Sequence, residues 1–297
     1  MSSPGLSLVG FMTDQQQAFL HLRMDCVPAD ASDRALSAEW VAAKAKRGPP
    51  MPKAGAPDIQ PMPPAAEPYI TQLMQQPWVK ATFQIFAVAK AEFKMVEIDP
   101  LLAYDVLFDE DRSKHHCGKL NKPSIADLLP ICLPLAQPKP LDLSPIVNTK
   151  EPQSIVVKVR NLSMQQMNVG IFGLNQNGYE SWVAGMQIHI TSPFVHVVHL
   201  NGRYYLHNGF HRAIGARRAG ATHVPCLLRD VTTPHEAGIM GAGRTFPLAV
   251  LESDDPPTIG HFTQGRAHDV RIRAVSRILH ISCSQSVMPD EYENMNP

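Results

Sequence analysis

The chain has 297 residues, enough for one large domain or two smaller ones. Its 44% hydrophobic and 18% charged content is typical of a globular protein, and 27 basic residues balance 27 acidic ones, so no net charge attracts it to a polyanion. Five scattered cysteines with no CxxC pair argue against a disulfide framework or cysteine-rich zinc site and favour reduced thiols. No segment approaches the roughly 20 apolar residues that span a bilayer. We expect a cytoplasmic protein without membrane contact.

Two helices and a proline-rich stretch are predicted at the N-terminus. Thr13 and Gln16 have capping-box spacing ahead of the helix QQQAFLHLR, and Ser32 or Asp33 can cap a second helix, RALSAEWVAAKAK. We expect an N-terminal helical arm over 1–48. Residues 49–68 should form an extended linker, because each proline removes an amide donor and fixes φ.

The next part mixes helices with less regular segments. The patterns predict helices over 68–76 and 78–93, then a short strand, KMVEID, that stops at Asp99-Pro100. Residues 109–119, DEDRSKHHCGK, are expected to form an exposed loop, and the apolar piece around Ile125 to Leu129 is interrupted by prolines.

A β-hairpin is predicted where SPFVHVVHL and RYYLHNG flank Asn201-Gly202, a pair that readily adopts a type I′ turn. A two-residue loop places Leu200 opposite Arg203 and, further along, His196 opposite His207. Alternation then separates two faces of the hairpin. The expected core face holds Val195, Val197, Tyr204 and Leu206, and the other face holds His196, Val198, Tyr205 and His207.

The second strand ends at Asn208-Gly209 and a short helix, HRAIGARRA, begins at once. Gly220 supplies a left-handed stop, and THVPCLLRDV follows as another strand. The helix N-terminus exposes unpaired amides and a partial positive charge, which favour an anion. Arg212 in the first turn could grip two phosphate oxygens, and His211 could donate a hydrogen bond or move a proton.

The residues Asn-Gly-Phe-His-Arg, followed by a helix and GATHVPCLL, resemble the turn of the ParB/sulfiredoxin superfamily. In that superfamily the turn follows a strand, opens a helix and binds nucleotide phosphates. The resemblance covers about residues 192 to 231, with KMVEIDP as a first strand of the same core. It implies an α+β (mixed α/β) fold in which a ParB/sulfiredoxin-like domain with insertions spans 69–284, before a polar tail at 285–297.

The resemblance and the anion argument together give the candidate site. His211 and His207 are the candidate catalytic residues, and Mg²⁺ with a bound nucleotide is the expected cofactor. No protein metal site is expected. The candidate ligand-binding residues are Asn208, Gly209, Phe210, His211, Arg212, Arg217 and Arg218.

Differences between this turn and that of known superfamily members disfavour some of the superfamily's activities. Sulfiredoxins carry a nucleophilic cysteine where this chain has Phe210, and ParB proteins usually carry a glutamate beside the paired arginines, which is absent between Asn208 and Arg218. Sulfinic-acid reduction and a centromere clamp are therefore disfavoured. The related serine kinases place an aspartate at the position of Asn208. Phosphoryl-transfer or phosphodiester chemistry stays open but unassigned.

Other patterns are better explained by structure. A metal held by His196, His207 and His211 is a weaker interpretation than a polar strand face. The glycines in GIMGAGRTF lack the lysine of a phosphate loop and favour a flexible loop. Four arginines, Arg266, Arg271, Arg273 and Arg277, make the C-terminal strands the most basic part of the chain.

We therefore expect a protein that binds a nucleotide or other phosphate-bearing ligand, with an enzymatic role as phosphotransferase or nuclease-like hydrolase left open. One alternative is a non-enzymatic module that binds a protein partner through its N-terminal arm. The other is a nucleic-acid-binding protein that uses the C-terminal arginines and the turn together.

Overall fold

A computed structural model describes residues 2–26, 28–85, 90–136, 144–147, 154–159, 164–176, 179–190, 193–234, 236–237, 245–273 and 277–282. The chain divides into two compact units. Unit 1 comprises 1–138 and 192–274, and unit 2 comprises 139–191 and 275–297. The predicted N-terminal arm and proline-rich linker therefore both fall within unit 1, and the segment expected to be one domain contributes to both units.

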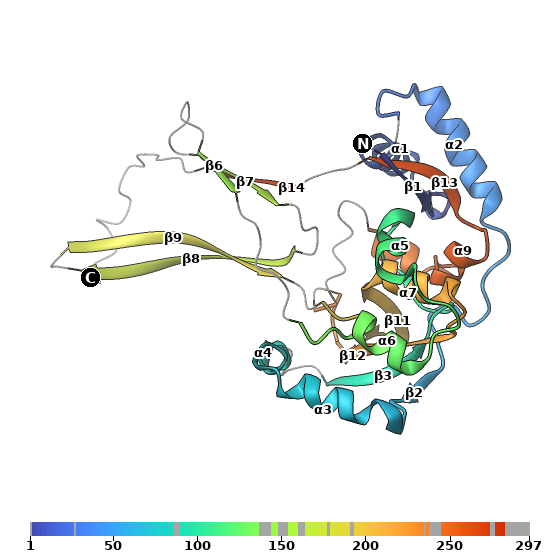
Figure 1. Cartoon of the computed structure of the whole chain (residues 1–297). Helices are drawn as coiled ribbons and strands as arrows, with labels where there is room; N and C mark the ends of the chain where they lie inside the picture. Colours follow the sequence, from blue (N-terminus) through green and yellow to red (C-terminus); the bar gives the residue numbers. More distant parts are fainter. Residues whose placement is uncertain are drawn as a thin grey trace, which may run out of the picture. The chain divides into compact units, whose positions relative to one another are not determined.

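Unit 1 is built around a six-stranded mixed sheet in the order β2-β3-β12-β10-β11-β4. Figure 1 labels β2, β3, β12 and β11 of this sheet. The neighbouring strands of the sheet are antiparallel except for β10 with β12 and β11 with β4, which are parallel. The proline-rich linker contributes the edge strand β2, where Pro61 is tolerated because an edge strand need not pair on both sides. The strands are β2 (Ile59–Pro61), β3 (Ala91–Glu97), β4 (Leu102–Ala103), β10 (His196–Leu200), β11 (Arg203–Asn208) and β12 (His223–Asp230).

The β10–β11 hairpin has the predicted turn and most of the predicted register. Asn201 and Gly202 have φ of 52° and 76°, and Leu200 pairs with Arg203. A bulge between His196 and Val197 shifts the last pair, so that His196 lies opposite Asn208 and not His207. The prediction of one core face was wrong as well, because side chains on both faces of the hairpin are buried.

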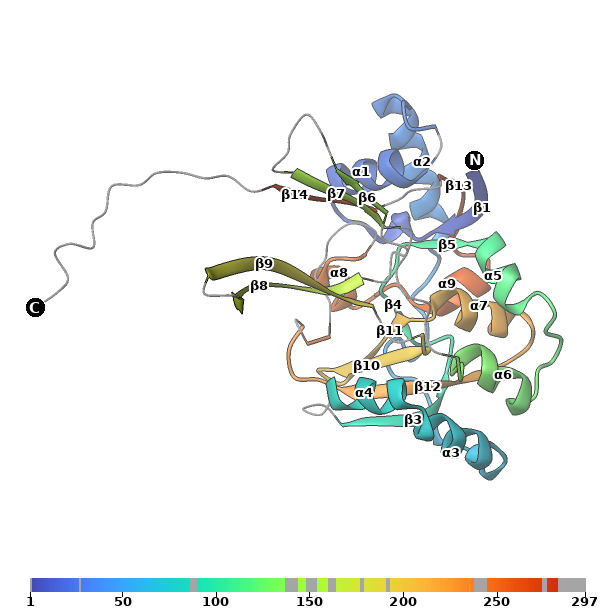
Figure 2. The same cartoon turned by 60° about the vertical axis from the view of Figure 1, so that its left-hand side comes forward.

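Helices pack against this sheet and against one another (Figure 2). The short helix after β11 is confirmed as α7 (Phe210–Arg218), which contacts β12, α6 (Ile125–Cys132) and α5 (Glu110–Cys117). Two further helices, α3 (Glu67–Gln75) and α4 (Pro77–Ile85), precede β3. Residues 86–89 lie outside the described part, and residues 91–93, predicted as the end of a helix, belong to β3.

Helix α5 corrects the prediction of an exposed loop at 109–119. The Asp109 side chain accepts a hydrogen bond from the backbone N–H of Arg112, which caps the helix start. Ser113 and Cys117 are buried four residues apart, on the side that packs against α7. Helix α6 is also more regular than expected, with a capping box at Ser124 and Pro130 inside the helix.

A second sheet of unit 1 joins the chain's N-terminus to later segments in the order β13-β1-β5. It comprises β1 (Ser2–Ser7), β5 (Leu107–Asp109) and β13 (His268–Arg273), all antiparallel. The arm helices are α1 (Gln15–Asp25), capped by Asp14 and not by the predicted Thr13, and α2 (Asp33–Lys46), capped by Ser32 as predicted. Short helical segments lie at η1 (Val9–Phe11), η2 (Pro64–Ala66), α8 (Leu248–Leu251) and α9 (Ile259–Thr263).

Unit 2 contains β-strands in its described residues. Three antiparallel strands, β6 (Ser144–Val147), β7 (Ser154–Val159) and β14 (Arg277–Ser282), form one sheet. A long hairpin pairs β8 (Met164–Gln176) with β9 (Tyr179–Ile190). Together with unit 1, these elements confirm the α+β class. Residues 238–244 of the predicted glycine-rich loop and the predicted tail at 285–297 lie outside the described residues.

Candidate functional site

The strand-to-helix junction at the candidate site depends on Gly209. This residue is the N-cap of α7 with φ of 84°, in the left-handed region where only glycine is unstrained. A Cβ there would lie 2.7 Å from the Val195 Cγ2 and 2.8 Å from the Val195 Cα. The Asn208 side chain accepts a hydrogen bond from the Gly209 N–H at 2.8 Å. The close approach at Gly209 is therefore to Val195 of the protein itself.

Arg212 lies at this junction as a partly buried cation anchored by backbone oxygens. Its Nη1 donates to the carbonyl of Ile131 at 3.1 Å and to the carbonyl of Pro193. Its Nε and Nη2 have no hydrogen-bond or carboxylate partner within the part of the chain that the structure describes. Burial lowers the pKa of the guanidinium. Arg212 is therefore held through Nη1, and the N–H groups of Nε and Nη2 have no partner among the described residues.

The two candidate catalytic histidines are partly buried, and their rings are neutral near pH 7. The His211 Nε2 accepts a hydrogen bond from the Asp109 N–H at 3.1 Å, so its proton resides on Nδ1. Burial, followed by the positive charge of Arg112, lowers the His211 pKa to about 3. Burial and then Arg229 lower the His207 pKa to about 3, and this ring stacks on Tyr104. At neutral pH neither ring has a proton of ordinary acidity to donate, which gives no support to their predicted catalytic role.

Phe210 belongs to the core and not to a ligand surface. Its side chain is 3% exposed and meets the ring of Phe262 edge-on at 5.0 Å. Another edge contact joins it to Phe108 at 6.3 Å. In this structure Phe210 can contribute its backbone N–H at the helix start, but its ring is covered by protein.

Arg217 and Arg218 point to carboxylates and not to the start of α7. Arg217 forms a bidentate ion pair with Asp99 at 2.8 to 3.0 Å, and this hydrogen bonding raises its pKa. Arg218 pairs with Glu110 at 3.2 Å and lies over the Phe108 ring. Both arginines were predicted to bind phosphate, but in the structure their guanidinium groups bind carboxylates of the protein.

Helix α5 brings to the site a cation, Arg112, and a histidine, His116, neither of which was predicted to belong to it. Arg112 and His116 are four residues apart on α5, and their charges act on His211. Burial lowers the His116 pKa, and the neighbouring Arg212 and Arg112 lower it further. Recognition of 110–117 as a helix would have placed both residues on one face. The start of α7 thus has more positive than negative side chains around it.

The C-terminal arginines are also partly used by the fold. The Arg266 guanidinium donates to the Pro49 carbonyl at 2.6 Å, and Arg273 donates to the carbonyls of Arg23 and Met24 at the end of α1. Arg271 is exposed on β13, whereas the side chain of Arg277 is not described. The predicted basic face is therefore reduced to Arg271 among the arginines whose side chains the structure shows.

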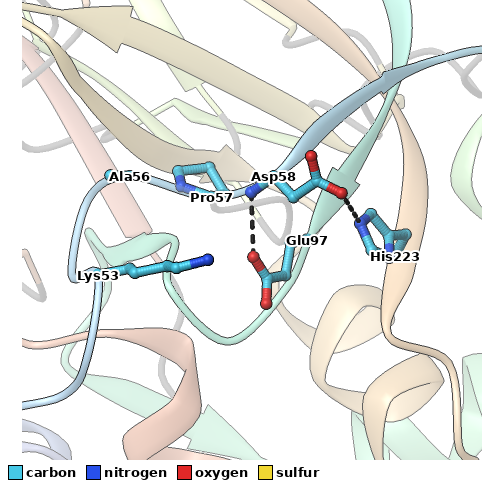
Figure 3. A pocket seen from close by; sticks show the side chains of 6 residues that line it. All are labelled: Lys53, Ala56, Pro57, Asp58, Glu97 and His223. Carbon is cyan, nitrogen blue, oxygen red and sulfur yellow. Dashed lines mark hydrogen bonds and ion pairs between the residues drawn. The ribbon is translucent and has the colours of Figure 1, made fainter.

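A separate open pocket of about 580 Å³ lies at the edge of the six-stranded sheet (Figure 3). Its polar lining residues come from the linker, β3 and the start of β12, and no pattern in the sequence predicts that they lie together. The residues that line it are Lys53, Ala56, Pro57, Asp58, Glu97 and His223.

Searches for metal sites, membrane helices and relatives gave no match. The described residues contain no group of three or more His, Cys, Asp or Glu that could hold a metal ion. Among the helices that the structure describes, none combines the length and the apolar character needed to cross a bilayer. No protein-family model, curated protein or solved structure matches this chain.

Proposed function

We propose that this protein binds a phosphate-bearing ligand, such as a nucleotide, at the start of α7. The observation that carries the proposal is the partly buried guanidinium of Arg212, which lacks a carboxylate partner within the described residues. A cation moved out of water is stabilised when a negative group pairs with it. The anion site is defined here as the Nε and Nη2 edge of Arg212 with the backbone N–H groups of Phe210 and His211.

The anchoring of Arg212 suits this role. Nη1 is held by the carbonyls of Ile131 and Pro193, so the guanidinium plane is fixed before a ligand arrives. The remaining Nε–Nη2 edge is the one that binds two phosphate oxygens in a bidentate manner. Nη2 also lies 3.1 Å from the position that a Cβ of residue 209 would occupy, which places it beside the helix start. The first-turn amides and the helix dipole add to the same attraction.

Binding is supported better than catalysis. The lone pair of the His211 Nε2 already accepts the Asp109 N–H, so this atom cannot take a proton from a substrate without a rearrangement. Mg²⁺ would have to be brought with the phosphates of the ligand, because Mg²⁺ is commonly held by substrate phosphates and few protein carboxylates. Phosphoryl transfer and phosphodiester hydrolysis remain expectations from the family resemblance.

Calorimetry with a nucleotide panel tests the proposal. Pyrophosphate and the nucleoside triphosphates are titrated with and without Mg²⁺ into the wild type and into Arg212→Lys, Arg112→Gln and Arg218→Gln. We expect at least one ligand to bind, with Arg212→Lys weakening it about 10-fold or more because lysine keeps the charge but loses the planar fork. Arg112→Gln should weaken it less, through the loss of one nearby exposed charge.

Arg218→Gln is the matched control, since Arg218 lies on the same helix but pairs with Glu110. Equal affinity in the wild type and a folded Arg212→Lys protein would overturn the site. Binding by no member of the panel would overturn the function. That negative result would favour a protein-binding role for the N-terminal arm, where Leu20, Met24 and Val41 are 58%, 55% and 60% exposed.

A further inference from the structure

Thr222, His223 and Asp58 form a continuous hydrogen-bonded series, and the last two of them line the pocket of Figure 3. The Thr222 Oγ1 lies 3.0 Å from the His223 Nδ1, and the His223 Nε2 lies 3.2 Å from the Asp58 Oδ2. Asp58 comes from the linker and His223 from the start of β12, 165 residues later in the chain. The order hydroxyl, imidazole, carboxylate is the one that activates serine and threonine nucleophiles.

The carboxylate sets the direction of the hydrogen bonds in this series. A hydrogen bond from Gln60, and then the contact with His223, hold the Asp58 pKa below its usual range, so Asp58 is ionised at neutral pH. An ionised carboxylate only accepts, so the His223 Nε2 donates to it. The Gln60 Nε2, which lies 3.4 Å from this ring nitrogen, donates to the same carboxylate oxygen at 2.6 Å. The Nδ1 lone pair is left to accept the hydroxyl proton of Thr222. In this tautomer the imidazole faces the hydroxyl as a base.

Access suits a reaction at Thr222. Thr222 is exposed, whereas His223 is partly covered. Lys53 lines the adjoining pocket, and its ammonium has no hydrogen-bond or ion-pair partner among the described residues. Figure 3 shows this side chain extending into the pocket toward Glu97. The turn that bears it is fixed by the bond from the Ala56 N–H to the Lys53 carbonyl at 2.8 Å.

We propose that Thr222, His223 and Asp58 form an acyl-transfer site that accepts an acyl group from an activated carboxylic ester. The Thr222 Oγ1 bonds to the acyl carbon while its proton passes to the His223 Nδ1, and Asp58 stabilises the imidazolium. The bond from the acyl carbon to the leaving alcohol oxygen then breaks, and His223 returns the proton to that oxygen. Water repeats the sequence on the threonine ester and releases the carboxylic acid.

Acetylation by p-nitrophenyl acetate provides the test. The full-length protein is expected to release p-nitrophenol with an initial burst and to carry one acetyl group on the peptide that contains Thr222. Alkaline hydroxylamine should remove that group, which distinguishes an ester on Thr222 from an amide on Lys53. Thr222→Val should abolish the adduct, and His223→Asn and Asp58→Asn should slow its formation, the former by about 100-fold as expected for loss of a general base.

Thr71→Val is the matched control, because Thr71 is an exposed threonine of α3 that does not belong to the hydrogen-bonded series. It should leave the burst and the adduct unchanged. The proposal fails if the wild type gains no ester at Thr222, or if a folded His223→Asn protein is acetylated there at the wild-type rate.

Discussion

At the scale of single residues, burial decides the charge of the histidines in this protein. His207 and His211 are each held neutral by burial, with pKa values of about 3 against an ordinary value near 6.5. The sequence shows two histidines close to a turn, and it is the packing of Tyr104 and Phe108 against them that removes their usual role as proton carriers near pH 7.

This burial predicts a loss of stability in acid. Both folded-state pKa values are depressed, so the unfolded chain binds more protons, and the stabilisation present above about pH 6.5 falls as the pH drops from there toward 3. Urea unfolding at pH 7.5 and pH 5.0 should show a lower free energy of unfolding at pH 5.0. His207→Phe should reduce that difference. His115→Gln, a change at an exposed histidine of α5, should leave it as in the wild type.

At the scale of elements, the junction of β11 and α7 sets the geometry of the candidate site. The same few residues pack the helix start against Val195, fix Arg212 between Ile131 and Pro193, and leave one guanidinium edge without a partner among the described residues. The packing of the helix start against Val195 and the geometry of the anion site therefore both depend on the left-handed backbone conformation of Gly209.

Gly209→Ala tests this dependence. An alanine at this position would have to adopt the positive φ of Gly209, and its Cβ would lie 2.7 to 2.8 Å from atoms of Val195. We therefore expect a loss of about 2 to 4 kcal/mol in the free energy of unfolding. Gly202→Ala is the control, since Gly202 has φ of 76° but nothing within 4 Å of its added Cβ. That variant should lose only about 1 kcal/mol from backbone strain. Equal losses in urea unfolding of the two variants would contradict the close packing at residue 209.

At the scale of the whole molecule, the two chain segments that lead into and out of the 139–191 insertion are bonded together inside unit 1. The Val195 N–H donates to the Cys132 carbonyl at 2.7 Å, and Arg212 binds Ile131 and Pro193. Tyr69 and Trp78 donate to the carbonyls of residues 133 and 135. These bonds hold both segments without any residue of unit 2.

We therefore expect unit 1 to fold without unit 2. A chain in which a short Gly/Ser linker replaces residues 139–191 and which ends at residue 274 should keep a cooperative thermal transition and a native-like far-UV circular dichroism spectrum. The full-length protein measured in parallel is the reference. A deletion protein with a non-cooperative transition would show that unit 1 needs unit 2 to fold.

Much of the local structure follows from the sequence because its causes are local. Asn201-Gly202 determines the hairpin turn, Ser32 caps α2, and Gly209 permits the strand-to-helix junction. The errors lie where contacts between distant residues outweigh the local pattern. Residues 110–117 appear too polar for a buried element, yet Ser113 and Cys117 fit against Gly215 of α7, where an added Cβ would lie 2.7 Å from either side chain.

The sequence alone determined that a helix begins beside a glycine with a histidine and an arginine in its first turn, because turn and capping preferences act over a few residues. Only the tertiary structure decided what these side chains do. Arg212 meets carbonyls 81 and 19 residues away, and Arg217 meets a carboxylate 118 residues away. The hydrogen-bonded series of Thr222, His223 and Asp58 likewise depends on a carboxylate from the linker. Such pairings are set by the packing of the whole chain, which no short stretch of residues contains.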